Sequence, residues 1–179
     1  MNVAALVLAA ACGIHFSVPR GWVVHVTHPE SNICEAGVSP RNWEALVEKA
    51  RWPDADEAVS VSVVTGSLDD AADVAGFFRD ENGRLMTGDR GREFPPTPTM
   101  HSGLSGWEMS GWSRGYAKEG VDLGDGSRLT SNTFYSVLLK RSKRSYIVVR
   151  YEEGNPDIPS TRVDRVKAAK LVLRTIRPR

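Results

Sequence analysis

The chain has 179 residues, which suffices for one domain with a sizeable core and falls short of two ordinary domains. Hydrophobic residues make up 41% of it and charged residues 25%, as in a typical globular protein. Its 23 Lys and Arg residues nearly balance 22 Asp and Glu residues, so no net field favours nucleic acid, and we expect no nucleic-acid partner.

Residues 1–11 are uncharged, small and mostly apolar, a pattern typical of the apolar part of an export signal. Ala9 and Ala11 occupy the small-residue positions that precede a cleavage site, although a basic start is missing. We therefore expect residues 1–11 to be a truncated signal segment and residues 12–179 to form one domain of a periplasmic or secreted protein. The alternative is an N-terminal extension without a targeting role. The run is far shorter than the ~20 apolar residues of a membrane-spanning helix, so we expect no transmembrane segment.

Cys12 and Cys34 are the two cysteines of the chain, and three interpretations are open. An exported protein would readily join them in a disulfide between the starts of the first and third predicted strands. Alternatively, the stretch from Leu8 to Cys12 loosely matches the lipid-attachment sequence of bacterial lipoproteins, which would place a lipid anchor at Cys12. The third interpretation is a pair of buried thiols.

Apolar residues alternate with polar ones over 14–18 and again over 22–27, and Pro19 and Gly21 separate the two runs. This pattern predicts two strands joined by a tight turn, as a hairpin. Ser67 is a helix-capping residue, and the helix that it starts is expected to present an apolar face that ends at Phe78. In chain order, the predicted strand, helix, strand and helix that follow the hairpin span 33–38, 40–51, 59–63 and 67–78.

Residues 79–103 show little periodicity and predict a long loop, with one short strand at Arg84–Met86. The proline-rich run Phe94–Thr99 cannot belong to a central strand, because proline lacks the backbone donor. Strands resume at Leu104, and Gly111 predicts a bulge in this strand. Two further strands and a closing helix are predicted over 133–139, 146–151 and 160–176.

In the closing helix, apolar residues at helical spacing form one stripe, and Arg165 belongs to the charged face that is expected to meet solvent. The stripe consists of Val163, Val166, Ala169, Leu173 and Ile176. Strands followed by helices in this order predict an α+β fold, with helices packed on a twisted antiparallel sheet.

Five segments resemble the PsbP-like/DcrB-like family of exported bacterial proteins. They are Phe16–Trp22, Gly103–Trp107, Thr133–Leu139, Tyr146–Tyr151 and Leu173–Pro178. The resemblance implies an antiparallel sheet of about seven strands sandwiched by helices. It also implies a non-enzymatic accessory or binding module, because the family has no universal catalytic residues.

His25, His28 and Cys34 are the only candidates for a metal site or a hydrolytic centre. Residues three apart on a strand point to opposite faces, so the two histidines are poor co-ligands unless the strand ends between them. Cys34 lies in an apolar strand, where a thiol is usually inert. We therefore expect no enzyme activity and no cofactor, and keep a metal-binding protein or hydrolase as the alternative.

Lys140, Arg141, Lys143 and Arg144 form a basic run between two predicted strands. Such a run would meet an acidic partner or anionic headgroups, or would only keep a turn solvated and block edge pairing. Trp112 is a further candidate for a binding patch. The sequence thus favours an exported, protein-binding module of the bacterial envelope, with an immunity or chaperone protein for a secreted effector as the alternative.

Overall fold

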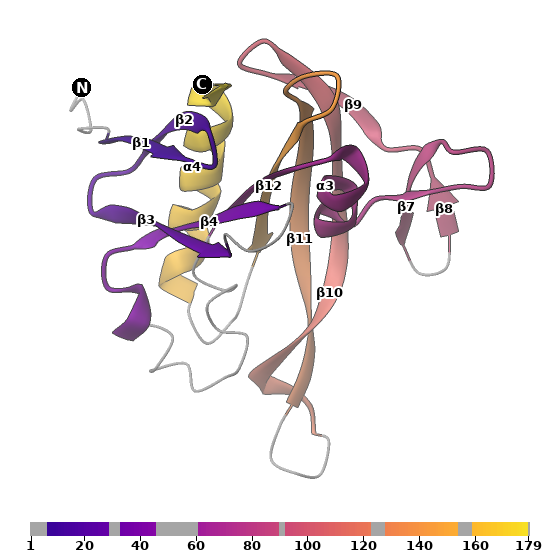
Figure 1. Ribbon diagram of the computed structural model, residues 1–179. Coiled ribbons are helices and arrows are strands. Elements are labelled where there is room, and N and C mark those ends of the chain that lie inside the picture. The colour runs from indigo at the N-terminus through magenta and orange to yellow at the C-terminus, as the bar shows by residue number, and fades with distance from the viewer. Residues whose placement is uncertain are drawn as a thin grey trace.

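The computed structural model describes residues 7–28, 33–45, 61–89, 92–122, 128–153 and 159–178. The fold is α+β, and its largest part is an antiparallel sheet of seven strands, which confirms the predicted class (Figure 1). In spatial order the strands are β3 (Trp22–His28), β4 (Cys34–Pro40), β5 (Val61–Gly66), β12 (Tyr146–Glu153), β11 (Arg128–Lys140), β10 (Leu104–Asp122) and β9 (Thr97–His101).

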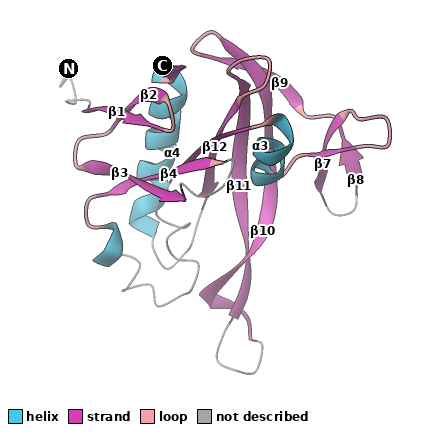
Figure 2. Ribbon diagram, viewed as in Figure 1, coloured by secondary structure: helices cyan, strands magenta, loops and turns pink. Residues whose placement is uncertain are grey.

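Two helices pack on opposite faces of this sheet, α3 (Leu68–Ala75) and α4 (Pro159–Thr175) (Figure 2). Neighbouring residues of a strand point to opposite faces, so each central strand serves two cores. Val149 and Val137 belong to the core under α4, whereas Val148 and Leu138 belong to the core under α3. These four residues are at most 6% exposed.

A second sheet, of three strands, lies against α4. Its order is β1 (Val7–Ala11), β2 (Ile14–Val18) and β13 (Arg177–Pro178). Ile14, Phe16 and Val18 of β2 are buried in the core under α4. Thr175 Oγ1, at the end of the helix, accepts a hydrogen bond of 2.8 Å from Ser17 N, which fixes β2 beside the helix.

The predicted hairpin of strands 14–18 and 22–27 is wrong, although both strands exist. The tight turn is present, with Trp22 N donating to Pro19 O at 3.1 Å, but β2 pairs with β1 and β13 while β3 pairs with β4. The turn is therefore a corner between two sheets. The reason for the departure is long-range: β2 pairs with β13, which directly follows α4, and buries Ile14, Phe16 and Val18 in the core under this helix.

The end of the predicted signal segment forms β1, in register with β2 from Val7 opposite Val18 to Ala11 opposite Ile14. Ala11 is 8% exposed and belongs to the core under α4. The export signal itself stays a prediction.

Cys12 and Cys34 are joined by a disulfide, with their Cα atoms 5.3 Å apart. The bond ties the β1–β2 turn to the first residue of β4, and thus the small sheet to the large one. Thr65 Oγ1 also donates to Cys12 O at 3.3 Å. A lipid on Cys12 would need the same sulfur atom and is incompatible with this bond.

The cap of α3 agrees with the sequence, but its end does not. Ser67 Oγ accepts from Asp70 N at 3.3 Å, as expected for an N-cap. The helix ends at Ala75 because Gly76 adopts a left-handed conformation with φ of 84°. Phe77 then enters the core, and Phe78, which was expected on the helix, is 37% exposed. Of the predicted helix over 40–51, residues 43–45 are helical and the rest lies outside the described residues.

The expected loop over 79–103 contains four short strands. Three of them form a small sheet, β6 (Phe78–Arg79), β7 (Leu85–Asp89) and β8 (Arg92–Phe94), of which β7 and β8 project from the large sheet (Figure 1). The fourth, β9, contains Pro98 and lies at the edge of the large sheet. The expectation that the proline-rich run avoids the centre of a sheet is therefore confirmed.

The bulge predicted at Gly111 is wrong. The register of β10 with β11 runs without interruption from Gly106 to Tyr116, and Gly111 stands opposite Phe134. A Cβ at Gly111 would lie 2.8 Å from Cζ of Phe134, so the glycine makes room for this ring. The register shifts instead between Tyr116 and Val121.

The predicted apolar stripe of α4 is confirmed at Ala169, Leu173 and Ile176, which are buried, whereas Val166 is half-buried. Among the side chains of the helix that the structure describes, the buried ones are Arg165, Ala168, Ala169, Val172 and Leu173. Arg165, Ala168, Val172 and Ile176 follow one another at intervals of three or four residues, so Arg165 occupies the inner face by periodicity. The prediction that Arg165 meets solvent is therefore wrong.

Candidate functional site

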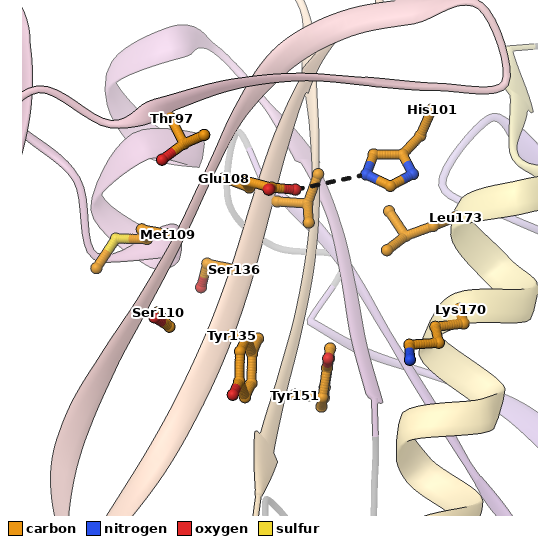
Figure 3. A pocket seen from close by; sticks show the side chains of 11 residues that line it. Thr97, His101, Glu108, Met109, Ser110, Tyr135, Ser136, Tyr151, Lys170 and Leu173 are labelled. Carbon is orange, nitrogen blue, oxygen red and sulfur yellow. Dashed lines mark ion pairs between the residues drawn. The ribbon is translucent and has the colours of Figure 1, made fainter.

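A groove lies where α4 stops covering the sheet, with a volume of about 300 Å³ (Figure 3). Strands β9 to β12 line one side of it, and α4 contributes Lys170 and Leu173 to the other. The strand residues that line it are Thr97, His101, Glu108, Met109, Ser110, Tyr135, Ser136, Val137 and Tyr151.

The antiparallel register brings the side chains of the groove together. Glu108 stands opposite Thr97, and Ser110 stands opposite Tyr135, so residues of three strands share this face. His101 directly precedes the turn formed by Ser102 and Gly103, whose φ values of 51° and 80° are those of a type I′ turn. Ser102 Oγ donates to Leu173 O at 3.0 Å and holds this turn against the end of α4.

Charged groups of both signs surround the groove. His101 Nε2 lies 3.8 Å from Glu108 Oε2 and 3.3 Å from Thr99 Oγ1. The Glu108 side chain is 46% exposed and that of His101 is 26% exposed, so solvent screens their interaction. Lys170 is exposed on α4, across from them (Figure 3).

Tyr135 and Tyr151 form the aromatic part of the groove. Their ring centroids are 5.2 Å apart and the planes meet at 15°, a stacked arrangement. Both residues are half-buried, so the stack offers a rigid apolar surface beside the charged groups. Tyrosine in this setting is typical of protein-binding surfaces, because it provides a large contact area at a small cost in conformational entropy.

The structure does not bring His25, His28 and Cys34 together. The sulfur of Cys34 is bonded to Cys12, and the register places His25 and Cys34 on opposite faces of the sheet. His28 follows a register shift, opposite Glu35. Within the described ranges, no three His, Cys, Asp or Glu residues are arranged to hold a metal ion.

The His25 ring instead covers a glycine. It stacks on Trp43 with 4.9 Å between the centroids, and its Nδ1 lies 3.4 Å from Ser39 Oγ. A Cβ at Gly37, the cross-strand partner of His25, would collide with His25 Nε2. This histidine therefore has a packing role on the outer strands of the sheet.

Lys140 is the last residue of β11, and the other three basic residues lie in the loop between β11 and β12, but Trp112 is far from all four. Trp112 stands opposite Thr133, seven residues along β11 from Lys140, which is ~23 Å at about 3.3 Å per residue. Lys140, Lys143 and Arg144 are exposed. Arg141 differs, because its Nη2 donates to Gly13 O at 2.8 Å.

The groove residues were not singled out from the sequence. The tyrosines fit the apolar pattern of two predicted strands, and His101 fell in an expected loop. Only the cross-strand register, which a single sequence does not contain, places them on one surface. The pair Ser102–Gly103, as a hairpin turn, was the one local signal that could have located His101.

No family model matches the sequence, and no curated protein matches it significantly.

Among the described residues, no helix combines the length and the apolar character that crossing a bilayer requires.

Proposed function

We propose that this protein is a non-enzymatic, exported binding module of the bacterial envelope, related in architecture to the PsbP-like/DcrB-like proteins, and that its groove binds a segment of another protein. The observation that carries the proposal is the stacked pair Tyr135–Tyr151, flanked by charged groups of both signs. A partner segment would place an apolar side chain on the tyrosines and charged side chains opposite Glu108 and Lys170.

The composition of the groove supports binding over catalysis. Its lining combines aromatic and apolar side chains with polar and charged ones, a mixture that is usual in protein interfaces. Catalysis by Cys34 has less support, because its sulfur is engaged in the disulfide and His25 lies on the other face. The disulfide also supports export, since such bonds persist in oxidising compartments.

Site-specific photo-crosslinking tests this proposal. A benzophenone amino acid replaces Tyr135 in the protein expressed in its own host, and a second variant carries it at Val26, which is 53% exposed on β3. We expect an adduct at position 135 that is absent at position 26, with mass spectrometry identifying the partner. An immunity or chaperone role would show as an adduct with a secreted effector.

The captured partner is then purified and titrated against the wild-type protein and the Glu108→Arg variant. We expect at least tenfold weaker binding for the variant, because the reversed charge faces the bound segment. The control is Glu93→Arg, on exposed β8, which should bind like wild type. Equal adducts at positions 135 and 26, or equal affinities of all three proteins, would refute the groove as the binding site.

A further inference from the structure

Four segments of the chain meet at one end of the molecule. The loop between β11 and β12 begins at Lys140, which pairs with Tyr146. Arg141 contacts Gly13 of the β1–β2 turn, and Ser102 of the β9–β10 turn contacts Leu173 near the end of α4. In Figure 1 the β11–β12 loop, the β9–β10 turn and the C-terminal end lie along the same upper edge.

This end carries five exposed cations. Lys140 ends β11, Lys143 and Arg144 come from the loop that follows it, and Arg174 and Arg177 come from the C-terminal end. In the part of the chain that the structure describes, none of the five forms an ion pair. We call these five residues the basic end.

The acidic residues at the start of α3 lie on the other face of the sheet from α4. They follow Gly66, which pairs with Tyr146. Asp69 Oδ1 is paired with Arg79 Nε at 2.9 Å, and Asp70 Oδ2 accepts a hydrogen bond from Ser67 Oγ at 2.7 Å. These two carboxylates therefore already have partners.

Hydrogen bonds fix the loop that follows Lys140 and carries Lys143 and Arg144. Arg141 N and Ser142 N both donate to Ser145 O, at 2.9 and 3.0 Å, and Arg144 N donates to Ser142 Oγ at 3.3 Å. The bond from Arg141 to Gly13 ties the loop to the turn that the disulfide holds. The backbone that carries these exposed cations is therefore already held in place, and binding would cost little conformational entropy of the loop.

We propose that the basic end docks the protein on the surface of a membrane with anionic headgroups. The cations come from two separate segments and spread over an end of the molecule, which suits a broad, uniformly charged surface. Met100, 69% exposed next to the β9–β10 turn, adds a flexible apolar side chain at the same end. Each Lys or Arg near an anionic leaflet strengthens the attraction of the protein to the membrane. This attraction weakens as salt screens the charges.

Vesicle co-sedimentation tests this docking with the full-length purified protein. The vesicles contain phosphatidylcholine alone or with about 30% phosphatidylglycerol, a fraction that gives a negative surface. We expect binding only to the anionic vesicles. The double variant Lys143→Gln/Arg144→Gln should bind about thirtyfold more weakly, because each cation near an anionic surface contributes about 1 kcal/mol and the loss of two corresponds to about that factor.

A matched control removes two cations elsewhere. Arg20 and Arg41 are exposed at the corner between the two sheets, where Arg41 N donates to Gly21 O. The variant Arg20→Gln/Arg41→Gln has the same net charge as the first variant and should bind anionic vesicles like wild type. Equal loss in both variants would show a net-charge effect and overturn the proposal. Binding to poly-glutamate but not to vesicles would also overturn it, in favour of an acidic protein partner.

Discussion

Three glycines of the large sheet show how a missing side chain sets local packing. Gly111 admits the Phe134 ring, Gly37 lies under the His25 ring, and a Cβ at Gly106 would collide with the Leu138 carbonyl oxygen. None of the three has a positive φ. These positions therefore need glycine because a larger side chain would have no room. In each case the group that fills the space belongs to the neighbouring strand.

We predict that Gly111→Ala destabilises the protein by about 1 to 3 kcal/mol, because the added methyl group overpacks the contact with Phe134. Urea denaturation measures the change. Adding Phe134→Leu to Gly111→Ala should restore part of the loss, by giving the methyl group room. The control Ser105→Ala, on an exposed position of β10, should stay within about 0.5 kcal/mol of wild type. A Gly111→Ala protein as stable as wild type would contradict this account of the glycine.

Asp80 organises the turn between β6 and β7. Its carboxylate accepts from Arg84 N at 2.8 Å and from Asn82 N at 3.0 Å, and Arg84 Nε approaches it to 2.6 Å. The hydrogen bond from the Arg84 backbone, with further bonds from Arg84 and Asn82, lowers the pKa of Asp80 below its ordinary value of 3.8. A lowered carboxyl pKa stabilises the folded turn above the unfolded-state value, and this contribution is lost as the pH falls through the folded-state value.

Hydrogen exchange at the Asn82 and Arg84 amides checks this linkage. Relative to intrinsic rates, we expect Asp80→Asn to exchange faster than wild type near neutral pH. The difference should shrink as the pH falls below the ordinary pKa, because the wild-type carboxylate then becomes protonated. Glu81→Gln, in the same exposed turn, serves as the control and should leave both amides unchanged. A constant difference across the pH range would argue against titration of Asp80.

At the scale of single elements, the sequence identifies strands better than their partners. The period of two in 14–18 and 22–27 predicts both β2 and β3, but nothing local shows that Pro19–Gly21 leads into another sheet. Helix ends show the same limit. Ser67 predicts the start of α3 correctly, whereas the apolar period continues past Gly76 to Phe78 and does not show where the helix ends. The groove depends on register between four strands and α4, and for this reason no sequence period could reveal it.

Removing the disulfide should loosen the small sheet first. In the chain-entropy model, opening a loop of 22 residues costs about 3 kcal/mol of stability, and we expect this loss for Cys12→Ser/Cys34→Ser. Hydrogen exchange should show the largest acceleration at the β1 amides, because this outer strand depends on β2 and the turn at Cys12. Reduced wild-type protein should behave like the variant. Unchanged stability after reduction would contradict a supporting role of this bond.

At the scale of the whole molecule, the two cores share their central strands. Val148 and Val149 are adjacent and both 0% exposed, yet one packs under α3 and the other under α4. Loss of packing in either core therefore destabilises the same strand, β12. The two cores should unfold together.

The pair Val148→Ala and Val149→Ala tests this cooperativity. Each change removes two methyl groups from a filled core, and we expect each to lower the free energy of unfolding by about 2 kcal/mol. Both variants should unfold in a single urea transition, with an unchanged dependence of the free energy of unfolding on urea concentration. Tryptophan fluorescence and circular dichroism should give the same midpoint. A second transition in either variant would show that the cores unfold separately.

The bond between Ser17 and Thr175 joins residues 158 positions apart, and it has a consequence for biosynthesis. Ile14, Phe16 and Val18 leave the ribosome early, but the helix that buries them is made after all seven strands of the large sheet. Until then the nascent chain exposes an apolar strand with an incomplete set of neighbours. Folding therefore completes only after α4 is released, and a stalled or truncated product that lacks this helix would be a ready target for holding chaperones and proteases.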